Sequence, residues 1–387
     1  MSFDAGDRAI SVVRVDLYRA RLELVHEFET SSHRKGHIEH ILVRVADADG
    51  GTGWGEVACP SDPYYCEENV DTCWLMLKRY LVPALLDAAW THPQQVGEHM
   101  SRVRGNRFAK AGLEMACWDL HARRAGISLA EALGGTASRV PAGVSLGIEP
   151  TVERLLETVE RHARQGYRRV KLKIRPGWDV EPVRAVRSHF PQLALQVDAN
   201  CAYRPGEESL SVLRRLDRLG LSMIEQPFAA GDLLAHRDLQ RALDTPVCLD
   251  ESIVDADSAA LALALGACRV VNIKVSRLGG LGPARALHDL CRERGIPVWC
   301  GGMHEFGIGR AANVAIASLP GFTLPGDVSG SDKYYARDLV QPPVAAHGGE
   351  VPVPWDRPGL GHEIVSERLE EALMLTETMT ARSAAPA

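Results

Sequence analysis

The sequence predicts an α/β fold: a closed (β/α) barrel that carries a smaller α+β capping domain. Three observations predict it. From about residue 140, short apolar runs alternate with amphipathic helical stretches, which is the pattern of parallel βα units. Eight such runs follow one another, and no glycine-rich phosphate fingerprint follows the first of them. The region before residue 140 combines alternating strand patterns with helical ones, so it predicts a separate cap.

The cap is predicted from its strand and helix patterns. The segments "AISVVRVDLYRARLEL" and "HILVRVADADGGTGWGE" alternate apolar and polar residues, and the Asp-Gly-Gly indicates a turn between antiparallel strands. The segments "TCWLMLKRYLVPALL" and "AKAGLEMACWDLHARRAG" have helical spacing, and the second ends in glycine, a common helix stop. We expect "LGHEIVSERLEEALMLTETM" to return to the cap and the tail "TARSAAPA" to be frayed. The predicted divisions are residues 1–138 for the cap, 139–335 for the barrel and 336–387 for the returning segment.

The barrel is predicted from the spacing of its strands. The apolar runs are "AGVSLGI", "RVKLKI", "LALQVDAN", "LSMIEQP", "PVCLDES", "RVVNIKV", "IPVWCGG" and "GFTLPGD". Successive polar residues at the ends of five runs are 25, 27, 25 and 24 positions apart, namely Lys173, Asp198, Glu225, Asp250 and Lys274. One βα unit fits in each step. An open doubly wound sheet is the alternative, but eight units in series favour closure.

Composition limits the classes of function. The chain has 387 residues, 45% hydrophobic and 24% charged, with a formal net charge of -6. This charge gives no basic footprint, so a small molecule is a better expectation than nucleic acid. No apolar run is long enough to cross a membrane, and no signal peptide pattern opens the chain, so we expect no membrane and a cytoplasmic location. The nine cysteines include no CxxC pair, which suits neither a disulfide framework nor a zinc site.

Residues 170–177, "VKLKIRPG", place two lysines on one face of a predicted strand. Taken alone, Lys171 and Lys173 suit a solvated strand edge. In a closed parallel barrel, however, neither face of an inner strand meets solvent. The lysines would then lie at the C-terminal mouth, where barrel enzymes keep their chemistry.

Three carboxylates are predicted to meet at the same mouth. Asp198, Glu225 and Asp250 end neighbouring strands, where they would repel one another unless a cation lay between them. Ligands that are all oxygen atoms favour Mg²⁺, with Mn²⁺ or another divalent cation as an alternative. The other interpretation is a ring of salt bridges, in which Lys171, Lys173 and Lys274 neutralise the carboxylates without a metal.

With a metal in the middle, Lys173 and Lys274 would face each other across it. Such a pair can remove a proton from the carbon between them and return one to it. The α-proton of a carboxylic acid is very weakly acidic, but a divalent cation on the carboxylate stabilises the enediolate that forms. The cation and Lys171 would favour the neutral amine of Lys173, the form that acts as a base.

The motifs "KLKI", "VDAN", "IEQP", "LDES" and "NIK", in this order, resemble the enolase superfamily, within its muconate-lactonizing subgroup. The resemblance implies a modified (β/α)8 barrel, (β/α)7β, with an α+β cap, and enediolate chemistry on Mg²⁺. By resemblance, the metal ligands are Asp198, Glu225 and Asp250, and the acid and base are Lys173 and Lys274. The residues that would support them are Lys171, Asn200, Glu251 and Asn272.

A narrower resemblance covers most of the chain, to about residue 340. The motifs "AKAGLEMACWDL", "NIKVSRLGGL", "WCGGM", "GRAANVAIASLPGFTLPGD" and "SDKYY" resemble the branch that contains o-succinylbenzoate synthase and N-succinylamino acid racemase. By resemblance, Ser145, Gly302 and Met303 would line the substrate pocket, and Arg277 would lie behind Lys274 and tune it. Homo-oligomers, either dimers or octamers, are expected on the same basis.

The chain departs from this branch in two places. His304 stands where the branch usually has an aliphatic residue, and Phe306 where it has a small one, so both are candidate substrate contacts. A histidine packed under the loop is the alternative for His304. The capping loop "FETSSHRKGHIEH" carries a basic cluster that could attract a second carboxylate of a substrate, or could be solvated, namely His33, Arg34, Lys35 and His37.

The resemblance leaves two activities open on one set of residues. The first is racemisation of an N-acylamino acid, such as an N-succinylamino acid, in which one lysine takes the α-proton and the other returns one. The second is the dehydration that makes o-succinylbenzoate, in which Lys173 removes the proton and Lys274 stays cationic. A related racemase, epimerase or lyase with an altered pocket is a further alternative. A non-catalytic binding scaffold is disfavoured because all five charged positions are intact.

Overall fold

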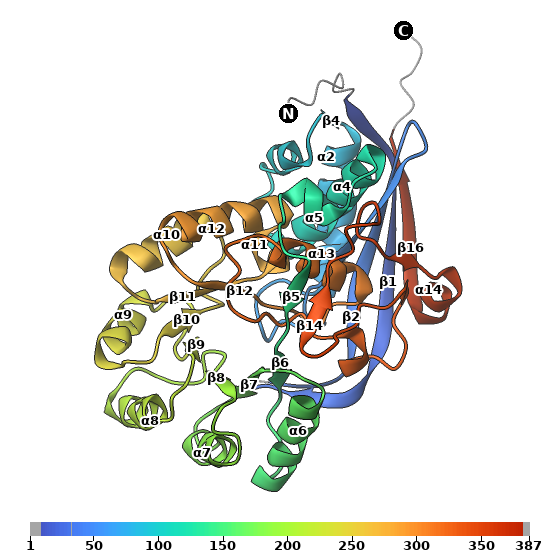
Figure 1. Ribbon diagram of the computed structural model, residues 1–387. Helices are drawn as coiled ribbons and strands as arrows, with labels where there is room; N and C mark the ends of the chain where they lie inside the picture. Colours follow the sequence, from blue (N-terminus) through green and yellow to red (C-terminus); the bar gives the residue numbers. More distant parts are fainter. Residues whose placement is uncertain (1–8, 32, 382–387) are drawn as a thin grey trace.

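The structure is a computed structural model that describes residues 9–31 and 33–381. Figure 1 shows an antiparallel sheet beside a curled parallel sheet with helices along its outer side. The predicted fold, a (β/α)7β barrel with an α+β cap, is confirmed. The predicted domain boundaries stay a prediction. Most of the predicted frayed tail, residues 382–387, lies outside the described residues.

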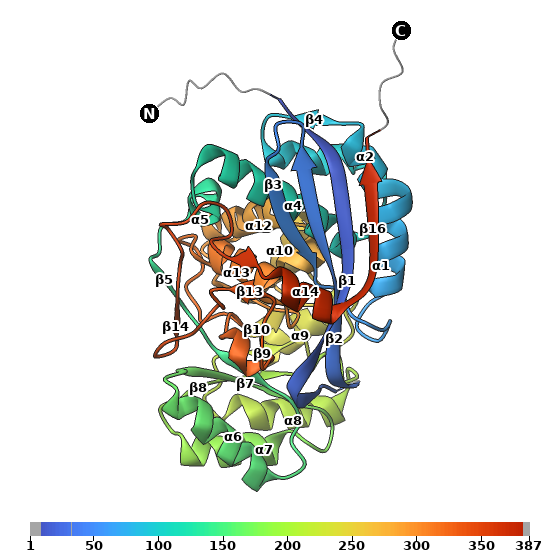
Figure 2. The same cartoon turned by 90° about the vertical axis from the view of Figure 1, so that its right-hand side faces the viewer.

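The cap is built on an antiparallel sheet with the order β16-β1-β2-β3, and β4 pairs with β1. Its strands are β1 (Ile10–Glu29), β2 (Arg34–Asp47), β3 (Thr52–Val57), β4 (Ala89–Trp90) and β16 (Leu373–Thr380). The predicted turn between β2 and β3 is present, and Gly50 adopts a φ of 84°, which glycine tolerates best. Arg14 pairs with Thr380, so the end of the described chain adds a strand to the N-terminal sheet (Figure 2). The expectation that this tail is frayed is therefore wrong for Thr380, because backbone pairing orders it.

The helices of the cap are α1 (Val70–Met76), η1 (Leu77–Leu81), α2 (Val82–Leu86), η2 (Pro93–Gln95), α3 (Val96–His99), α4 (Arg107–Ala125) and α5 (Leu129–Leu133). Of these, α1, α2 and α4 pack against the strands of the cap sheet. Helix α4 ends at Ala125, and Gly126, with a φ of 68°, stops the helix as predicted. It packs so closely on β3 that a Cβ at Gly55 would lie 2.0 Å from the Gly112 carbonyl oxygen. Glycine is required at this contact.

Seven parallel strands form the barrel sheet, in the order β12-β11-β10-β9-β8-β7-β6. They are β6 (Val144–Leu146), β7 (Arg169–Lys173), β8 (Ala194–Asp198), β9 (Ile224–Glu225), β10 (Val247–Leu249), β11 (Val270–Ile273) and β12 (Val298–Cys300). The helices that follow them are α6 (Val152–Arg164), α7 (Val180–His189), α8 (Glu207–Asp217), α9 (Leu233–Ala242), α10 (Ala256–Leu265), α11 (Val275–Leu278), α12 (Leu281–Glu293) and α13 (Gly307–Ala317). Each strand therefore has its helix.

The eighth predicted strand, "GFTLPGD", is the one barrel element that the structure corrects. It forms two isolated bridges, from Phe322 to β12 and from Gly326 to Ala142 next to β6. Pro325 has no N–H to donate, which prevents a regular ladder here. The segment still closes the barrel, because the Asp327 N–H donates to the Cys300 carbonyl at 2.8 Å and the Gly143 N–H donates to the Gly326 carbonyl at 2.7 Å.

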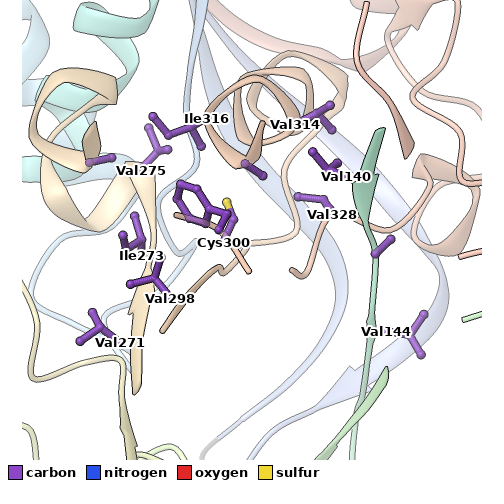
Figure 3. Close-up of a cluster of buried hydrophobic side chains, with 14 of the residues drawn as sticks. Val140, Val144, Val271, Ile273, Val275, Val298, Cys300, Val314, Ile316 and Val328 are labelled. Atoms are coloured by element: carbon purple, nitrogen blue, oxygen red, sulfur yellow. The ribbon is translucent and has the colours of Figure 1, made fainter. Parts of the chain in front are cut away.

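The strands separate an apolar outer layer from a more polar interior. Outward-facing side chains of β11 and β12 pack in one cluster with Val314 and Ile316 of α13 (Figure 3). A small separate apolar cluster is formed by Met223, which directly precedes β9, and by Cys248, Val270 and Trp299 at the alternate positions of β10, β11 and β12. Because successive residues of a strand point to opposite faces, those alternate positions face the barrel interior.

The rest of the chain connects the barrel to the cap. Its elements are β5 (Arg139–Pro141), η3 (Ser331–Lys333), β13 (Val340–Gln341), β14 (Glu350–Pro352), β15 (Glu363–Ile364) and α14 (Ser366–Ala372). Strand β14 pairs with β5, and β13 pairs with β15. Within the described ranges, no helix is both long and apolar enough to span a bilayer.

Candidate active site

The strand register brings the predicted charged residues together at the C-terminal ends of the strands. Lys173 of β7 is the register partner of Asp198 of β8, and Asp198 is the partner of Glu225 of β9. Asp250 and Lys274 directly follow β10 and β11. All five side chains are buried, with exposed fractions of 8% or less. The barrel mouth thus holds the predicted set.

The lysines and carboxylates of the mouth form ion pairs. Lys173 Nζ lies 2.6 Å from Asp198 Oδ2, and Lys274 Nζ lies 2.8 Å from Asp250 Oδ2. Lys171 Nζ lies 3.1 Å from Glu225 Oε2 and 3.3 Å from Asp198 Oδ2. These are ion pairs of the kind that the salt-bridge interpretation expects, and the metal site stays a prediction beside them.

The predicted supporting residues orient these groups. Asn200 accepts a hydrogen bond from Lys173 Nζ at 2.5 Å and donates to Glu251 Oε1 at 2.8 Å. Asn272 donates to Glu225 Oε1 at 2.8 Å. The Asn200 backbone has a φ of 43°, a left-handed conformation uncommon outside glycine, and it holds the amide over the mouth.

Arg277 lies behind Asp250, on the side away from the cavity. Its guanidinium is ion-paired with Asp250 and donates to the Asn272 carbonyl at 2.7 Å and to the Ile253 carbonyl at 2.6 Å. Since Asp250 also pairs with Lys274, Arg277 reaches Lys274 through this carboxylate. The position agrees with the expected tuning role, which stays a prediction.

Burial and neighbouring charges shift the pKa values of the acidic side chains at the mouth, some upward and one downward. Burial raises the pKa of Glu225 and of Glu251, and the nearby Asp198 carboxylate raises both further. Burial alone would also raise the pKa of Asp198, but Lys173 and Lys171 outweigh it and lower that pKa. Asp198 is therefore held as a carboxylate by the lysines.

Two of the lysines are held as ammonium ions. Burial alone would lower the pKa of Lys171, but Asp327, Glu225 and Asp198 outweigh it and raise that pKa. The pKa of Lys274 is raised as well. Burial alone would lower it, but the groups that raise it, of which Tyr65 and Glu251 are the largest, outweigh burial. Opposite charges nearby favour the charged form of each amine.

The carboxylate and amide oxygens of the mouth are the type of ligand that binds a hard cation, although they do not converge on one point. Within residues 9–31 and 33–381, no three His, Cys, Asp or Glu side chains lie together closely enough to hold a metal ion. Glu251 Oε2 and Asn272 Oδ1, however, are buried acceptors that have no hydrogen-bond partner in the described chain. Buried acceptors of this kind are costly unless a donor or a cation satisfies them. A hard divalent cation would be bound by such oxygens.

A cavity of about 210 Å³ opens above these groups. The barrel side contributes Lys173, Lys274 and Glu251, and the predicted pocket residues that line the same cavity are Ser145, Gly302, Met303 and His304. The Gly302 position leaves little space, because a Cβ there would lie 3.1 Å from Glu305 Oε2 and 3.2 Å from the Asp327 carbonyl oxygen. A small molecule in this cavity would contact both lysines.

His304 combines the two interpretations that the sequence left open. Its ring packs edge-on against Phe28, with centroids 4.5 Å apart, and lies 4.9 Å from the Tyr334 ring. Burial, with help from Lys35 and other cations, holds its pKa well below the usual range, so the ring is neutral. His304 is thus a packed histidine that also forms part of the cavity wall.

Phe306 does not line the cavity, which corrects its prediction as a substrate contact. Its side chain is fully buried and packs against His40 at 5.0 Å and Tyr335 at 5.4 Å between ring centroids. The strand ends at Cys300, and the irregular loop after it turns alternate side chains in directions that strand periodicity does not predict. Phe306 instead anchors the start of α13 under the cap.

The basic residues of the cap loop lie in different places, some in the cavity wall and some outside it. His33 and Lys35 line the cavity, while Arg34 forms an ion pair with Glu27 outside it. His37 Nε2 lies 3.7 Å from Glu39 Oε1. His33 and Lys35 are thus placed to meet a substrate in the cavity, and their attraction for a second carboxylate stays a prediction.

Several residues of the site were missed by the sequence analysis. Asp327 pairs with Lys171 at 2.9 Å and with Arg169 at 2.7 Å, and Tyr65 of the cap accepts a hydrogen bond from Lys274 Nζ at 3.2 Å. Asp327 ends the eighth apolar run, just as Asp198 ends an earlier one, so the same rule would have found it. Tyr65 has no such signal, because only the docking of the cap brings it to the mouth.

Fold and site together define a capped α/β-barrel enzyme with its polar groups at the barrel mouth. Comparison with known protein families narrows this class. Residues 154–368 match the family model "Enolase C-terminal domain-like", and residues 13–134 match "Mandelate racemase / muconate lactonizing enzyme, N-terminal domain". The chain belongs to the enolase superfamily, whose members use a divalent metal ion, typically Mg²⁺.

Individual relatives cover almost the whole chain. An o-succinylbenzoate synthase of Geobacillus stearothermophilus is 50% identical over 362 residues, covering 94% of this chain and 96% of that protein. An N-succinylamino acid racemase of Amycolatopsis sp is 49% identical over 358 residues, covering 92% and 96%. The crystal structure of an enolase-superfamily member from Listeria innocua Clip11262 superimposes with a TM-score of 0.93 at 37% identity, covering 96% and 100%.

Proposed function

We propose that this protein racemises N-acylamino acids, with N-succinylamino acids as the leading class. The observation that carries the proposal is that Lys173 and Lys274 line one cavity of about 210 Å³ from strands that β8, β9 and β10 separate. Amines that reach one carbon from two sides can exchange its proton with inversion. The relative of this activity from Amycolatopsis, at 49% identity, supports the proposal.

The two lysines would act in sequence on the α-carbon of the substrate. Lys173, as a neutral amine, takes the α-proton from one face and becomes an ammonium ion. Lys274, as an ammonium ion, then gives a proton to the opposite face and becomes an amine. For the other enantiomer the roles exchange, so no net proton is gained or lost.

We also propose that Asp198, Glu225 and Asp250 hold a divalent cation, Mg²⁺ or alternatively Mn²⁺. When bound, the cation would stabilise the negative charge that develops on the substrate carboxylate as the α-proton leaves. The unpaired acceptors of Glu251 and Asn272 support a cation in this region. Asp198 and Asp250 are also ion-paired with Lys173 and Lys274.

The second candidate function is o-succinylbenzoate synthesis, and the relatives named for it at 50%, 49% and 44% identity favour it. In this reaction Lys173 would remove the proton, and Lys274 would remain an ammonium ion beside the developing negative charge. The raised pKa of Lys274, where Tyr65 and Glu251 outweigh the effect of burial, suits that role. The same cavity serves both reactions.

One experiment separates the two candidates. The protein is incubated with Mg²⁺ in D₂O with single enantiomers of N-succinyl and N-acetyl amino acids, and α-proton exchange is followed by NMR. Exchange with loss of optical rotation, abolished by EDTA, is expected of the racemase. Absence of exchange on every substrate, together with formation of o-succinylbenzoate from its hydroxylated precursor, would replace the racemase by the second candidate.

A cytoplasmic location and a homo-oligomeric state, either a dimer or an octamer, remain proposals. The nine cysteines all lie within the described residues and are all free thiols, which suits a reducing compartment. The oligomeric state is checked by light scattering of the purified protein.

A further inference from the structure

The hairpin that joins β1 to β2 covers the barrel mouth and is fixed to it. Its turn is closed by the Thr30 N–H, which donates to the His33 carbonyl at 2.9 Å. The barrel holds the hairpin through the Ile148 N–H, which donates to the Glu29 carbonyl at 2.9 Å, and through the Asn200 carbonyl, which accepts from Ser31 Oγ at 3.4 Å. The hairpin therefore ends next to the amide that holds Lys173.

Strand pairing decides which side chains of this hairpin enter the cavity. Lys35 is the register partner of Phe28, so the two side chains share one face of the hairpin. Both line the cavity, and the Phe28 ring packs against His304 on the barrel side. Arg34, one residue earlier, points to the opposite face. Its carboxylate partner is Glu27.

Lys35 differs from the other lysines of the cavity, and the remaining guanidinium of the lining, Arg310, donates to the backbone carbonyls of Ser329 and Glu305. The ammonium groups of Lys171, Lys173 and Lys274 are all paired with carboxylates. Across the ranges that the structure describes, the side-chain amine of Lys35 has neither a hydrogen bond nor an ion pair. Burial lowers its pKa, and Lys173 and Lys274 lower it further, while Asp62 raises it. The roof of the cavity therefore holds a lysine amine that no carboxylate of the described residues approaches within ion-pairing distance.

A substrate with one carboxylate would leave Lys35 unpaired, because its α-carboxylate belongs with the groups on the cavity floor. A substrate with a second carboxylate could satisfy both ends of the cavity. We infer that Lys35 binds the distal carboxylate of the acyl group, so that the enzyme prefers N-acylamino acids with a dicarboxylic acyl group over those with a neutral one. The inference rests on the proposed function and assigns its specificity to one residue of the cap.

The test measures binding, so that it does not depend on turnover. In a Lys173→Ala background with Mg²⁺, calorimetry gives the Kd of the N-succinyl and N-acetyl derivatives of one amino acid. Adding Lys35→Met is expected to weaken N-succinyl binding by about tenfold to a hundredfold, the range of a charge-assisted hydrogen bond, and to leave N-acetyl binding within about twofold. Arg34→Met, the neighbouring change outside the cavity, is the matched control and should alter neither Kd. Lys35→Arg should keep the preference for the succinyl group.

Two results would overturn the inference: an equal loss for both ligands, which indicates a structural role, or no loss in Lys35→Met. If the protein binds neither N-acylamino acid, the proposed racemase fails first, and o-succinylbenzoate, which also has two carboxylates, is titrated instead. A weaker Kd in Lys35→Met for this ligand would support Lys35 as its carboxylate contact without the racemase. An unchanged Kd, or no binding of any of the three ligands, would reject the role of Lys35.

Discussion

Lys173 and Asp198 are register partners on neighbouring strands, and the Lys173 ammonium lies 2.6 Å from the Asp198 carboxylate. Lys274 and Asp250 repeat this relationship on the other flank of the mouth, at 2.8 Å. Each proposed acid or base is therefore held by a proposed metal ligand. If Asp198 and Asp250 hold the proposed cation, each carboxylate would serve both the cation and a lysine, and metal binding would be coupled to the freedom of the lysines.

The lysine pair predicts variants with opposite stereochemical defects. Lys173→Ala should lose α-proton exchange from one enantiomer and Lys274→Ala from the other, while neither variant racemises. The loss in each case should be about a hundredfold to ten thousandfold, the usual contribution of general acid–base catalysis. Exchange into D₂O from each pure enantiomer, followed by NMR, measures this.

The control for the lysine pair is Lys78→Ala, which removes an ammonium that pairs with Glu377 on the cap surface. It should leave both exchange rates unchanged. A Lys274→Ala variant that still racemised would contradict the two-base mechanism.

The carboxylates predict that Mg²⁺ stabilises the folded protein. At a concentration one hundred times its Kd, a ligand that binds only the folded state adds about 2.7 kcal/mol to the free energy of unfolding. The melting temperature should therefore rise by several degrees with Mg²⁺ and fall back with EDTA. Glu225→Gln, which keeps the shape of the side chain, should remove this rise.

Asp257→Asn is the matched control for the metal, because this carboxylate is exposed in the first turn of α10 and does not line the cavity. It should keep the full rise in melting temperature. An equal rise in Glu225→Gln and the unchanged protein would place the ion elsewhere.

Glu56 predicts a loss of stability when its charge is removed. This fully buried carboxylate on β3 accepts hydrogen bonds from the Phe306 N–H at 2.8 Å and the Gly309 N–H at 2.7 Å, and pairs with His40 at 2.6 Å. In Glu56→Gln an amide N–H would face one of these donors, so we expect a cost of about 2 to 3 kcal/mol. Urea denaturation measures it, with the exposed Glu98→Gln as the control. An unchanged midpoint would show that this clamp between cap and barrel contributes nothing.

Because of Lys333, we expect the free energy of unfolding to rise with pH. Burial lowers the pKa of its ammonium from 10.5 to about 7; the charged groups that act on it are Asp327, which raises the pKa, and Arg310, Arg169 and Lys171, which lower it. Its ammonium donates to the Ser145 carbonyl and the Tyr334 hydroxyl, and the nearby His162 is itself kept neutral by burial, with its pKa lowered to about 4. Between pH about 7 and pH 10.5, Lys333 is protonated in the unfolded chain and neutral in the folded chain. The free energy of unfolding therefore rises with pH in this window.

The comparison that isolates Lys333 is with Lys333→Met. Relative to this variant, the free energy of unfolding of the unchanged protein should increase by about 2 kcal/mol between pH 7 and pH 9. Urea denaturation at several pH values measures the difference. Parallel pH dependence of the two proteins would contradict the lowered pKa.

The hairpin loop shows why the sequence alone could not tell which basic residues enter the cavity. The basic cluster of residues 33–37 could be recognised, but not that Lys35 enters the cavity while Arg34 does not. That choice follows from the register of β1 against β2, which pairs Lys35 with Phe28. Register depends on the whole sheet and its docking on the barrel, so a local pattern does not contain it.

The sequence by itself determined the order of the βα units, the cap strands and helices, and the charged residues that end the strands, because hydrophobic period and spacing are local properties. Tertiary structure alone decided that the eighth run forms only bridges, that Phe306 lies behind the cavity, and that Tyr65 reaches Lys274. It also decided that the carboxylates pair with lysines and arginine. The reason is physical: side chains after a strand ends take their direction from long-range packing, and the partner of a buried charge is whichever group the fold brings within reach.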